Sequence, residues 1–224
     1  MRPRFNGGAQ ALQESYCLGV RRQPAVKPKA KTIFSSQKLK YNKWKWETKW
    51  KGSKSKDIGN DYQVIYHGVD NKRNGVVVVL DHNFKSRIVN ITRKSDRLIA
   101  VKLALNHQQV TNIISAYAPQ IGCTETEKLE FWEDFDELLQ GIPSNEYKIF
   151  GGDLNGHVGA TNETYINVHG GFGMGKLNKQ GEAILDFAAR HSLTLVNTNF
   201  KKRSEHLTTY KCAGKTSQID YRLY

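Results

Sequence analysis

The sequence has no long apolar run. No stretch of about 18 consecutive apolar residues occurs in the 224-residue chain, and a membrane-spanning helix needs about 20. Residues 1–23 also lack the continuous apolar segment and the small-residue cleavage site of a secretory signal. We therefore expect an intracellular protein with no membrane partner.

Cysteine is also scarce. Cys17, Cys123 and Cys212 stand far apart, and neither a C-x-x-C pair nor a Cys–His cluster at zinc spacing occurs. The pattern argues against a structural zinc site. It predicts three free thiols in a reducing compartment.

Acidic residues are few in the first quarter of the chain. Residues 1–60 hold 15 Lys and Arg against 3 Asp and Glu, which is +12 of the total net charge of +13. Residues 61–224 hold 19 basic and 18 acidic residues. A segment this basic attracts polyanions, with nucleic acid the first candidate. The alternative is a solvated tail without a partner.

Hydrophobic periodicity is missing from the same region. Residues 1 to about 40 contain three prolines, repeated glycines and the run KPKAK, and they follow neither a helical nor a strand period. We predict a basic, disordered segment over residues 1–45 and one folded domain over residues 46–224.

Periodic segments begin at about residue 62. Short β-branched segments separated by turn residues predict strands, at 62–68, 75–80, 86–91, 97–105, 109–117, 146–153, 193–198, 207–211 and 217–223. Two amphipathic segments predict helices over 124–140 and 181–192. This order of elements predicts an α+β domain, a sandwich of sheets with helices outside.

The two predicted helices have recognisable faces. Thr124 and Glu127 have the spacing of a capping box at the start of the first helix. The apolar stripe expected on that helix consists of Leu129, Trp132, Phe135 and Leu139. The face expected to be buried on the second helix consists of Ile184, Phe187, Ala188 and His191.

The segment IFGGDLNGHVG (149–159) carries the clearest chemical signal. An apolar run ends in two glycines, and Asp153 and Asn155 follow with one residue between them. In an extended segment alternate side chains share a face, so we expect the two polar groups to project together. A carboxylate that activates water beside an amide that donates to a phosphate oxygen suits phosphate-ester hydrolysis.

Two other interpretations apply to this segment. An Asp and an Asn after a strand also form ordinary Asx turns, and this alternative stays open. A calcium loop that begins at Asp153 needs Gly at its sixth position and Glu at its twelfth. Val158 and Thr164 stand there, so a calcium loop is excluded.

Several motifs in a fixed order give this signal a context. They are ETKWKGSK (47–54), HGVDNKRNGVVVVL (67–80), SDR (95–97), ISAYAPQIG (114–122), GGDLNGHVG (151–159) and TSQIDYRL (216–223). Together they resemble the endonuclease/exonuclease/phosphatase superfamily, above all the apurinic-like endonuclease domain of non-LTR retrotransposons. The resemblance runs from Glu47 to Tyr224. It implies a four-layer α/β sandwich, in which two packed mixed sheets are flanked by helices.

The resemblance also implies roles for individual residues. Glu47 is similar to the superfamily's metal-binding glutamate, which suits Mg²⁺, with Mn²⁺ as the alternative ion. Tyr117 is similar to a tyrosine that contacts the phosphate. Asp153 is similar to the water-activating aspartate, and Asn155 to its phosphate-orienting partner. Asp220 is similar to an aspartate that orients a catalytic histidine.

Three basic residues are candidate substrate contacts. Arg97, in SDR, is expected either to face the substrate or to brace the sheet. The NKRNG segment (71–75) predicts a hairpin turn first. Its Lys72 and Arg73 are also candidates for contact with a phosphate backbone.

The sequence departs from the superfamily pattern at both ends. Tyr224 follows Asp220 by four residues, whereas the final strand and its Asp–His pair would lie further on. The run KLKYNKWKWE (38–47) has too many lysines for a buried first strand, and Asn42 is not a convincing substitute for that strand's asparagine. We therefore expect a fold that is incomplete at both ends, lacks its final strand and carries Glu47 on a mobile tail.

The leading hypothesis is Mg²⁺-dependent hydrolysis of DNA phosphodiesters, with turnover weak or absent in this chain. The histidines that could replace the missing one are poor candidates: His157, His169, His191 and His206. The rival hypothesis is a noncatalytic nucleic-acid-binding remnant. Phosphatase action on a small phosphoester fits the superfamily but not the retrotransposon-like motifs. We expect a DNA-binding monomer, and the basic runs favour the nucleus.

Overall fold

The computed structural model describes residues 47–59, 61–71, 73–106, 109–161, 164–212 and 214–224. The segment predicted to be disordered, as well as Cys17 and Lys72, lies outside the described residues. Cys123 and Cys212 are both free thiols. None of the described helices is long and apolar enough to cross a membrane.

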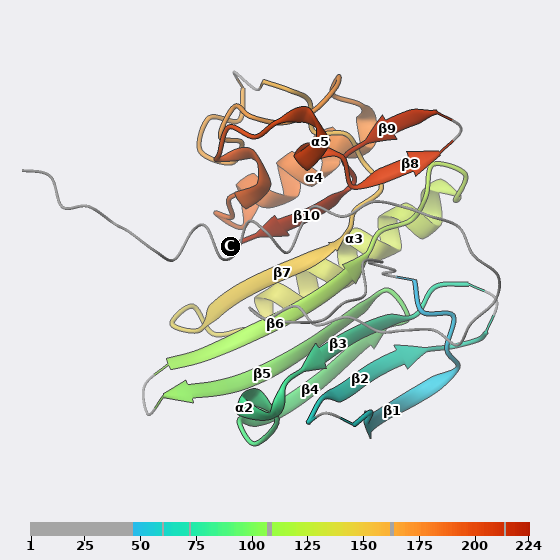
Figure 1. Ribbon diagram of the computed structural model, residues 1–224, viewed down its shortest axis with the longest axis vertical. Coiled ribbons are helices and arrows are strands. Elements are labelled where there is room, and N and C mark those ends of the chain that lie inside the picture. The colour runs from blue at the N-terminus through green and yellow to red at the C-terminus, as the bar shows by residue number, and fades with distance from the viewer. Residues whose placement is uncertain (1–46, 60, 72, 107–108, 162–163, 213) are drawn as a thin grey trace, which may run out of the picture.

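The described chain forms two sheets and a separate hairpin (Figure 1). The three-stranded sheet has the order β1-β2-β3 and consists of β1 (Gly52–Asp57), β2 (Gln63–Gly68) and β3 (Val76–Leu80). The five-stranded sheet has the order β10-β7-β6-β5-β4 and consists of β4 (Ile88–Ser95), β5 (Leu98–Asn106), β6 (Gln109–Tyr117), β7 (Tyr147–Asp153) and β10 (Asp220–Leu223). The hairpin consists of β8 (Tyr210–Cys212) and β9 (Lys215–Ser217).

In the described part of the chain helices are fewer than strands. They are α2 (His82–Lys85), α3 (Glu125–Gln140), α4 (Lys179–Arg190), α5 (Ser204–Leu207) and the 3₁₀ turn η2 (Val196–Thr198). In the five-stranded sheet β6 and β7 run parallel, because α3 forms the crossover between them, and the other neighbours are antiparallel. The prediction of an α+β fold is confirmed.

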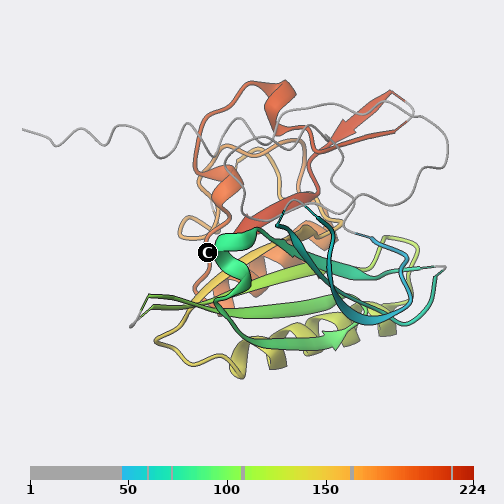
Figure 2. The same ribbon diagram turned by 60° about the horizontal axis from the view of Figure 1, so that its bottom comes forward.

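The two sheets pack face to face through alternate side chains. Ile65 and Val78 of the smaller sheet join Val101, Ile113 and Tyr117 of the larger sheet in one buried cluster. Successive strand residues point to opposite faces, so the intervening residues of β6 and β7 face the other way. Figure 2 shows the two sheets as stacked layers, with α3 below the larger one.

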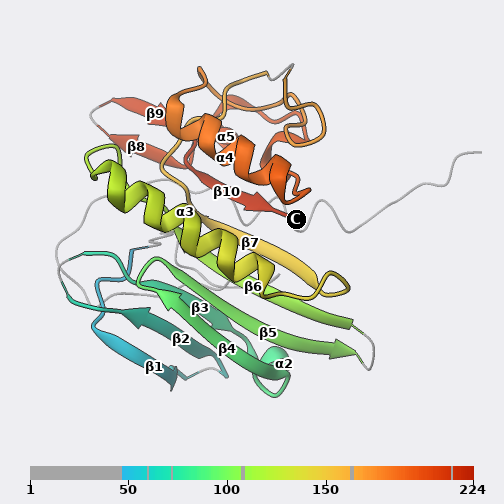
Figure 3. The same ribbon diagram turned by 180° about the vertical axis from the view of Figure 1, so that it is seen from behind.

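The other face of the five-stranded sheet is covered by α3 and α4 (Figure 3). Phe135 of α3 packs against Phe187 of α4 at 4.5 Å between ring centroids and against Phe150 of β7 at 5.4 Å. Among the described residues no helix covers the outer face of the three-stranded sheet, which is entirely antiparallel. The described part therefore contains the two packed sheets of the expected sandwich, with helices on the outer face of the larger sheet.

The predicted cap of α3 is confirmed, whereas its predicted buried face is partly wrong. Thr124 and Glu127 form the predicted capping box, with both reciprocal hydrogen bonds. The predicted stripe is shifted, because Leu129 is 60% exposed while Phe131 and Leu138 are buried. Asn178, which was not predicted, caps α4.

One predicted strand is wrong. Residues 193–198 form no strand, because Leu195 makes only single bridges to His169 and Leu223 before the chain turns into η2. Propensity favoured a strand, but no neighbour runs alongside this segment for more than one residue pair. In the opposite sense, β1 was missed, because its polar sequence GSKSKD has no apolar face to signal it.

Candidate active site

Three strand ends bring the polar candidates together. Tyr117 is the last residue of β6, Asp153 is the last residue of β7, and Asp220 is the first residue of β10. Asp153 is the register partner of both Tyr117 and Asp220. Neighbouring strands lie about 4.8 Å apart and register partners project to the same face. The three side chains therefore form one row across the sheet.

Burial and neighbouring charges control the protonation of Asp153. Burial, followed by repulsion from Asp220 and Glu47, raises the pKa of Asp153 to about 8, although the backbone N–H of Asn155 opposes the rise. The Asp153 carboxyl therefore carries its proton at neutral pH for most of the time. A cation beside it would favour the ionised form.

Asn155 lies in a turn and not in an extended segment. Its φ is 49°, its backbone N–H donates to Asp153 Oδ1 at 3.0 Å, and its Nδ2 donates to the carbonyl of Ala118 at 2.8 Å. The expectation of a shared extended face is wrong for this pair, because an Asx turn forms instead. The turn keeps the two side chains adjacent, and Asn155 Nδ2 has a second hydrogen to donate.

Tyr117 is buried at 4% exposure and keeps its proton. Burial, and then the charges of Glu47 and Asp153, raise its pKa to about 12. Its hydroxyl oxygen accepts from Gln120 Nε2 at 2.9 Å, which leaves the hydroxyl hydrogen available to a ligand. Arg97 donates to the Tyr117 carbonyl at 3.3 Å and lies 5.5 Å from the ring centroid. Arg97 is thus placed to brace the strand end.

Glu47 and Thr48 are hydrogen-bonded to the turn at residues 74–75. Glu47 Oε1 accepts from the backbone N–H of Asn74 at 3.0 Å, and Glu47 Oε2 lies 3.6 Å from Lys49 Nζ. The backbone N–H of Thr48 donates to the carbonyl of Gly75 at 2.9 Å. The expectation that Glu47 hangs on a mobile tail is wrong, because these contacts fix residues 47–49 against the turn before β3.

Two residues that position Glu47 were not predicted. Asn74, at a φ of 59°, donates through Nδ2 to Asp96 Oδ2 at 2.8 Å. Gly75 N–H donates to the Asp96 carbonyl, also at 2.8 Å. Asp96 precedes Arg97, so the SDR motif joins the Glu47 turn to Tyr117. Both motifs were visible in the sequence, but nothing in it shows that they pair.

The start of β10 is held from two sides. Thr209 Oγ1 accepts from the backbone N–H groups of Ile219 and Asp220 at 3.0 and 3.2 Å. Asn197 Nδ2 donates to the Asp220 carbonyl at 3.3 Å. Neither Thr209 nor Asn197 was predicted, and both come from segments that lie next to β10 only in the fold.

The basic candidates differ in placement. The Arg73 side chain is 71% exposed and lies 3.8 Å from Glu127 Oε1 at the start of α3. Lys72 lies outside the described residues. Three of the four histidine candidates have side-chain partners elsewhere. His169 hydrogen-bonds to the Gly159 carbonyl, His191 hydrogen-bonds to Asp136, and His206 lies 3.7 Å from Glu205 Oε1.

The carboxylates suit a hydrated Mg²⁺ ion better than a closed metal cage. Within the described residues no three His, Cys, Asp or Glu side chains converge as a metal cluster. Mg²⁺ usually keeps several waters and binds one or two carboxylates. The charge of Glu47 helps to raise the pKa of both Asp153 and Tyr117, so a cation at Glu47 would offset that charge and favour the ionised form of Asp153. The donor set fits the ion in this form.

In fold, the chain is similar to an endonuclease/exonuclease/phosphatase family protein from Leptotrichia buccalis C-1013-b, at 15% identity and a TM-score of 0.45 over 73% of this chain and 60% of that one. It is also similar to a humanized TDP2 from D. rerio, at 15% identity and a TM-score of 0.43 over 74% and 61%. The catalytic domain of human Nocturnin gives 15% identity and a TM-score of 0.42 over 73% and 60%.

In sequence, the chain is similar to craniofacial development protein 2. It is 27% identical to the Bos taurus protein over 218 residues, which is 95% of this chain and 36% of that protein. The Tragulus javanicus protein gives 27% identity over 218 residues, 95% of this chain and 37% of that protein. The chain thus spans little more than a third of the length of these relatives. No protein-family model matches it. The resemblance predicted from the ordered motifs is confirmed.

Proposed function

We propose that residues 46–224 form a domain for Mg²⁺-dependent hydrolysis of phosphodiesters in DNA. The observation that carries this proposal is the register row of Tyr117, Asp153 and Asp220, with the charge of Glu47 acting on the same row. A proton acceptor, a hydrogen-bond donor and a metal-binding carboxylate around one point are the parts that phosphodiester hydrolysis needs.

In this proposal Asp153 is the general base. Its raised pKa gives it a strong affinity for the proton of an attacking water, but it acts as a base only when ionised. Glu47 would hold the Mg²⁺, which supplies charge neutralisation at the phosphate. Asp220 keeps the proton affinity of Asp153 high through repulsion.

Two neutral groups support the binding of a phosphate oxygen. The Tyr117 hydroxyl accepts from Gln120, so its own hydrogen can point to the ligand. The second hydrogen of Asn155 Nδ2 can do the same, because the first is held by the Ala118 carbonyl. Both donors are fixed before the substrate arrives, which is how a site stabilises developing negative charge.

We expect slow turnover. His169, His191 and His206 bond to groups outside the row, so none of them supplies the donor expected of the superfamily's histidine. Loss of one donor of this kind lowers a rate about 10²–10³-fold.

DNA is the proposed polyanion, and a nuclear monomer is the proposed form. The hairpin β8–β9 carries Lys211 and Lys215, both exposed, and it leads within a few residues into Asp220. In Figures 1 and 3 the hairpin lies on the side toward which β6 and β7 point. Lysines beside a phosphate site raise the affinity for a nucleic-acid backbone.

A noncatalytic DNA-binding module is the second candidate. The burial of Asp153 favours it, because the raised pKa keeps the carboxyl from acting as a base near neutral pH but leaves the hydrogen-bond donors and the lysines intact. This candidate predicts salt-dependent binding that survives Asp153→Ala.

The deciding experiment is nicking of supercoiled plasmid in Mg²⁺ and in Mn²⁺. Wild type is compared with Asp153→Ala and with Glu133→Ala, whose side chain is exposed on α3 and serves as the control. Nicking by wild type and Glu133→Ala that disappears in Asp153→Ala supports hydrolysis. Equal nicking by all three contradicts it. No nicking, with DNA binding retained by all three, leaves the binding module.

A further inference from the structure

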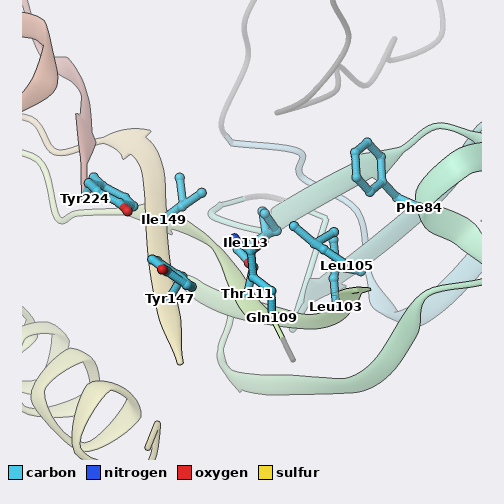
Figure 4. Close-up of a pocket in the computed structure, with 9 residues that line it drawn as sticks. All are labelled: Phe84, Leu103, Leu105, Gln109, Thr111, Ile113, Tyr147, Ile149 and Tyr224. Atoms are coloured by element: carbon cyan, nitrogen blue, oxygen red, sulfur yellow. The ribbon is translucent and has the colours of Figure 1, made fainter. Parts of the chain in front are cut away.

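A cleft lies at the opposite end of β7 from Asp153, and we call it the β7 cleft. Its volume is about 230 Å³. Figure 4 shows the side chains that line it: Phe84, Leu103, Leu105, Gln109, Thr111, Ile113, Tyr147, Ile149 and Tyr224. They come from α2, β5, β6, β7 and the residue after β10. The cleft shares no residue with the row of Tyr117, Asp153 and Asp220.

Strand register builds the floor of this cleft. Thr111 of β6 is the register partner of Leu103 on β5 and of Tyr147 on β7. Two residues further along, Ile113 pairs with Ile149. Register partners share a face, so these side chains stand side by side on the face of the larger sheet that also packs against the smaller sheet, where Leu103 and Ile113 are buried.

Aromatic rings frame one side of the opening. The rings of Tyr147 and Tyr224 are nearly parallel, with 6.4 Å between centroids and an interplanar angle of 11°. They are 46% and 56% exposed. Phe84 stands on the other side of the cleft (Figure 4). A flat ring entering the cleft would have Phe84 on one side and the two tyrosines on the other, and contacts between aromatic rings would stabilise it.

One polar group in the floor has no hydrogen-bond partner in the described part of the chain. Thr111 is 1% exposed, and its Oγ1 has no hydrogen-bond partner among the described residues. Buried hydroxyls normally have a partner, because leaving one unpaired costs free energy. Thr111 lines the cleft, and rotation about its χ1 torsion exchanges the positions of its methyl and hydroxyl groups. After that rotation a ligand in the cleft can supply the missing partner.

We propose that this cleft binds a small planar aromatic molecule that carries one hydrogen-bonding substituent. Size sets the first limit, since an apolar cavity of about 150 Å³ accommodates benzene and this cleft is somewhat larger. The apolar floor and the tyrosine rim select a flat ring. The Thr111 hydroxyl selects a ring with one polar group over a plain hydrocarbon. This inference does not depend on the proposed hydrolytic function.

The test uses phenol and toluene, which differ by the hydroxyl group. Both are titrated into the full chain while isoleucine methyl signals are followed by NMR. Ile113 and Ile149 report on the cleft, and Ile184, buried on the opposite face of the sheet, is the internal control. We expect phenol to shift the signals of Ile113 and Ile149, to leave Ile184 unchanged, and to bind more tightly than toluene.

Two variants test whether the Thr111 hydroxyl causes the preference for phenol over toluene and whether binding occurs in the cleft. Thr111→Val keeps the shape and removes the hydroxyl, so we expect it to weaken phenol binding about 2- to 10-fold and to leave toluene unchanged. Ile149→Trp fills the cleft and should abolish binding of both. Val89→Trp, at an exposed position of β4, is the matched control and should change neither.

Three results would overturn the proposal: equal affinities of the wild type for phenol and toluene, the same phenol affinity in Thr111→Val, or shifts centred on Ile184. The methyl spectrum of each variant shows whether it is folded. The hydroxyl in wild type has no described partner, so its loss in Thr111→Val leaves no buried group unpaired, and we expect that variant to fold.

Discussion

The candidate active site has two halves that are held in different ways. The strand half consists of Tyr117, Asp153 and Asp220, which end or begin three adjacent strands. The turn half consists of residues 47–49, the turn at residues 74–75 and Asp96, which are joined by hydrogen bonds between loops. The two halves interact electrostatically, because the charge of Glu47 helps to raise the pKa of Asp153 and of Tyr117.

Because of this difference, the strand half sets the geometry of the site and the turn half sets its affinity for Mg²⁺. In the strand half every position follows from ladders that are buried between the smaller sheet and the two helices, so its spacing is lost only if the sheet is lost. In the turn half a few bonds between partly exposed groups hold the carboxylate that would bind Mg²⁺. We therefore expect mutations in the strand half to affect folding or chemistry, and mutations in the turn half to affect metal affinity.

The largest effect should come from Gly152→Ala, which breaks the strand half. An added Cβ at Gly152 would lie 2.0 Å from the Ala116 carbonyl oxygen, so β6 and β7 must separate. We expect a loss of about 1–3 kcal/mol in the free energy of unfolding. Gly122→Ala is the control, since its Cβ would meet nothing within 4 Å. Equal urea midpoints for the two variants would show that the ladder tolerates the change.

The sequence predicted most of the strand half. The β6 bounds match the predicted strand, and Asp153 ends its strand as expected, because β-branched runs bounded by turn residues leave few alternatives. The sequence could not place Asp220 beside Asp153. That contact depends on β10 pairing with β7 across 67 residues of chain, and no local pattern encodes a pairing at that distance.

The turn half was predicted in its residues but not in its structure. Glu47 was expected on a mobile tail, because the lysine-rich run before it has no strand pattern. The contacts that fix it come from Asn74 and Asp96, whose role depends on a backbone φ of 59° at Asn74 and on the meeting of two loops. Such contacts arise only once the sheets have packed. For the same reason the register of the β7 cleft was not foreseen.

A sizeable effect should appear in the pH dependence of stability. The pKa of Asp153 is about 8 in the folded chain and about 3.9 when unfolded, so the folded state binds the extra proton between these values. The contribution of Asp153 is therefore complete at low pH and is lost as pH rises toward 8. We expect Asp153→Asn to gain stability relative to wild type over this range. Thermal melts from pH 4 to pH 9 test this, and parallel curves would contradict it.

A smaller effect should follow from loosening the turn half. Asp96→Ala removes the side chain that accepts from Asn74 Nδ2. We expect Mg²⁺ affinity to fall about tenfold, because loss of a partner that orients a ligand typically costs that much, while thermal stability without metal stays close to wild type. Calorimetric titration with Mg²⁺ measures the change, with Glu133→Ala, at an exposed position of α3, as the control. Unchanged affinity would show that Glu47 is held without this turn.

The smallest effect should be on the salt dependence of DNA binding, through lysines that lie outside both halves. Lys211 and Lys215 are exposed on the hairpin that leads into Asp220. Each lysine that neutralises one DNA phosphate contributes about 0.9 to the slope of log affinity against log salt concentration. The double variant Lys211→Ala/Lys215→Ala should therefore reduce the slope by up to ~1.8 without altering stability. Fluorescence anisotropy with a labelled duplex at several salt concentrations gives the slope. The control is Lys54→Ala/Lys56→Ala on β1, where both side chains are also exposed. If the two double variants lower the slope equally, DNA is attracted by the general positive charge of the chain and not by the hairpin beside the site.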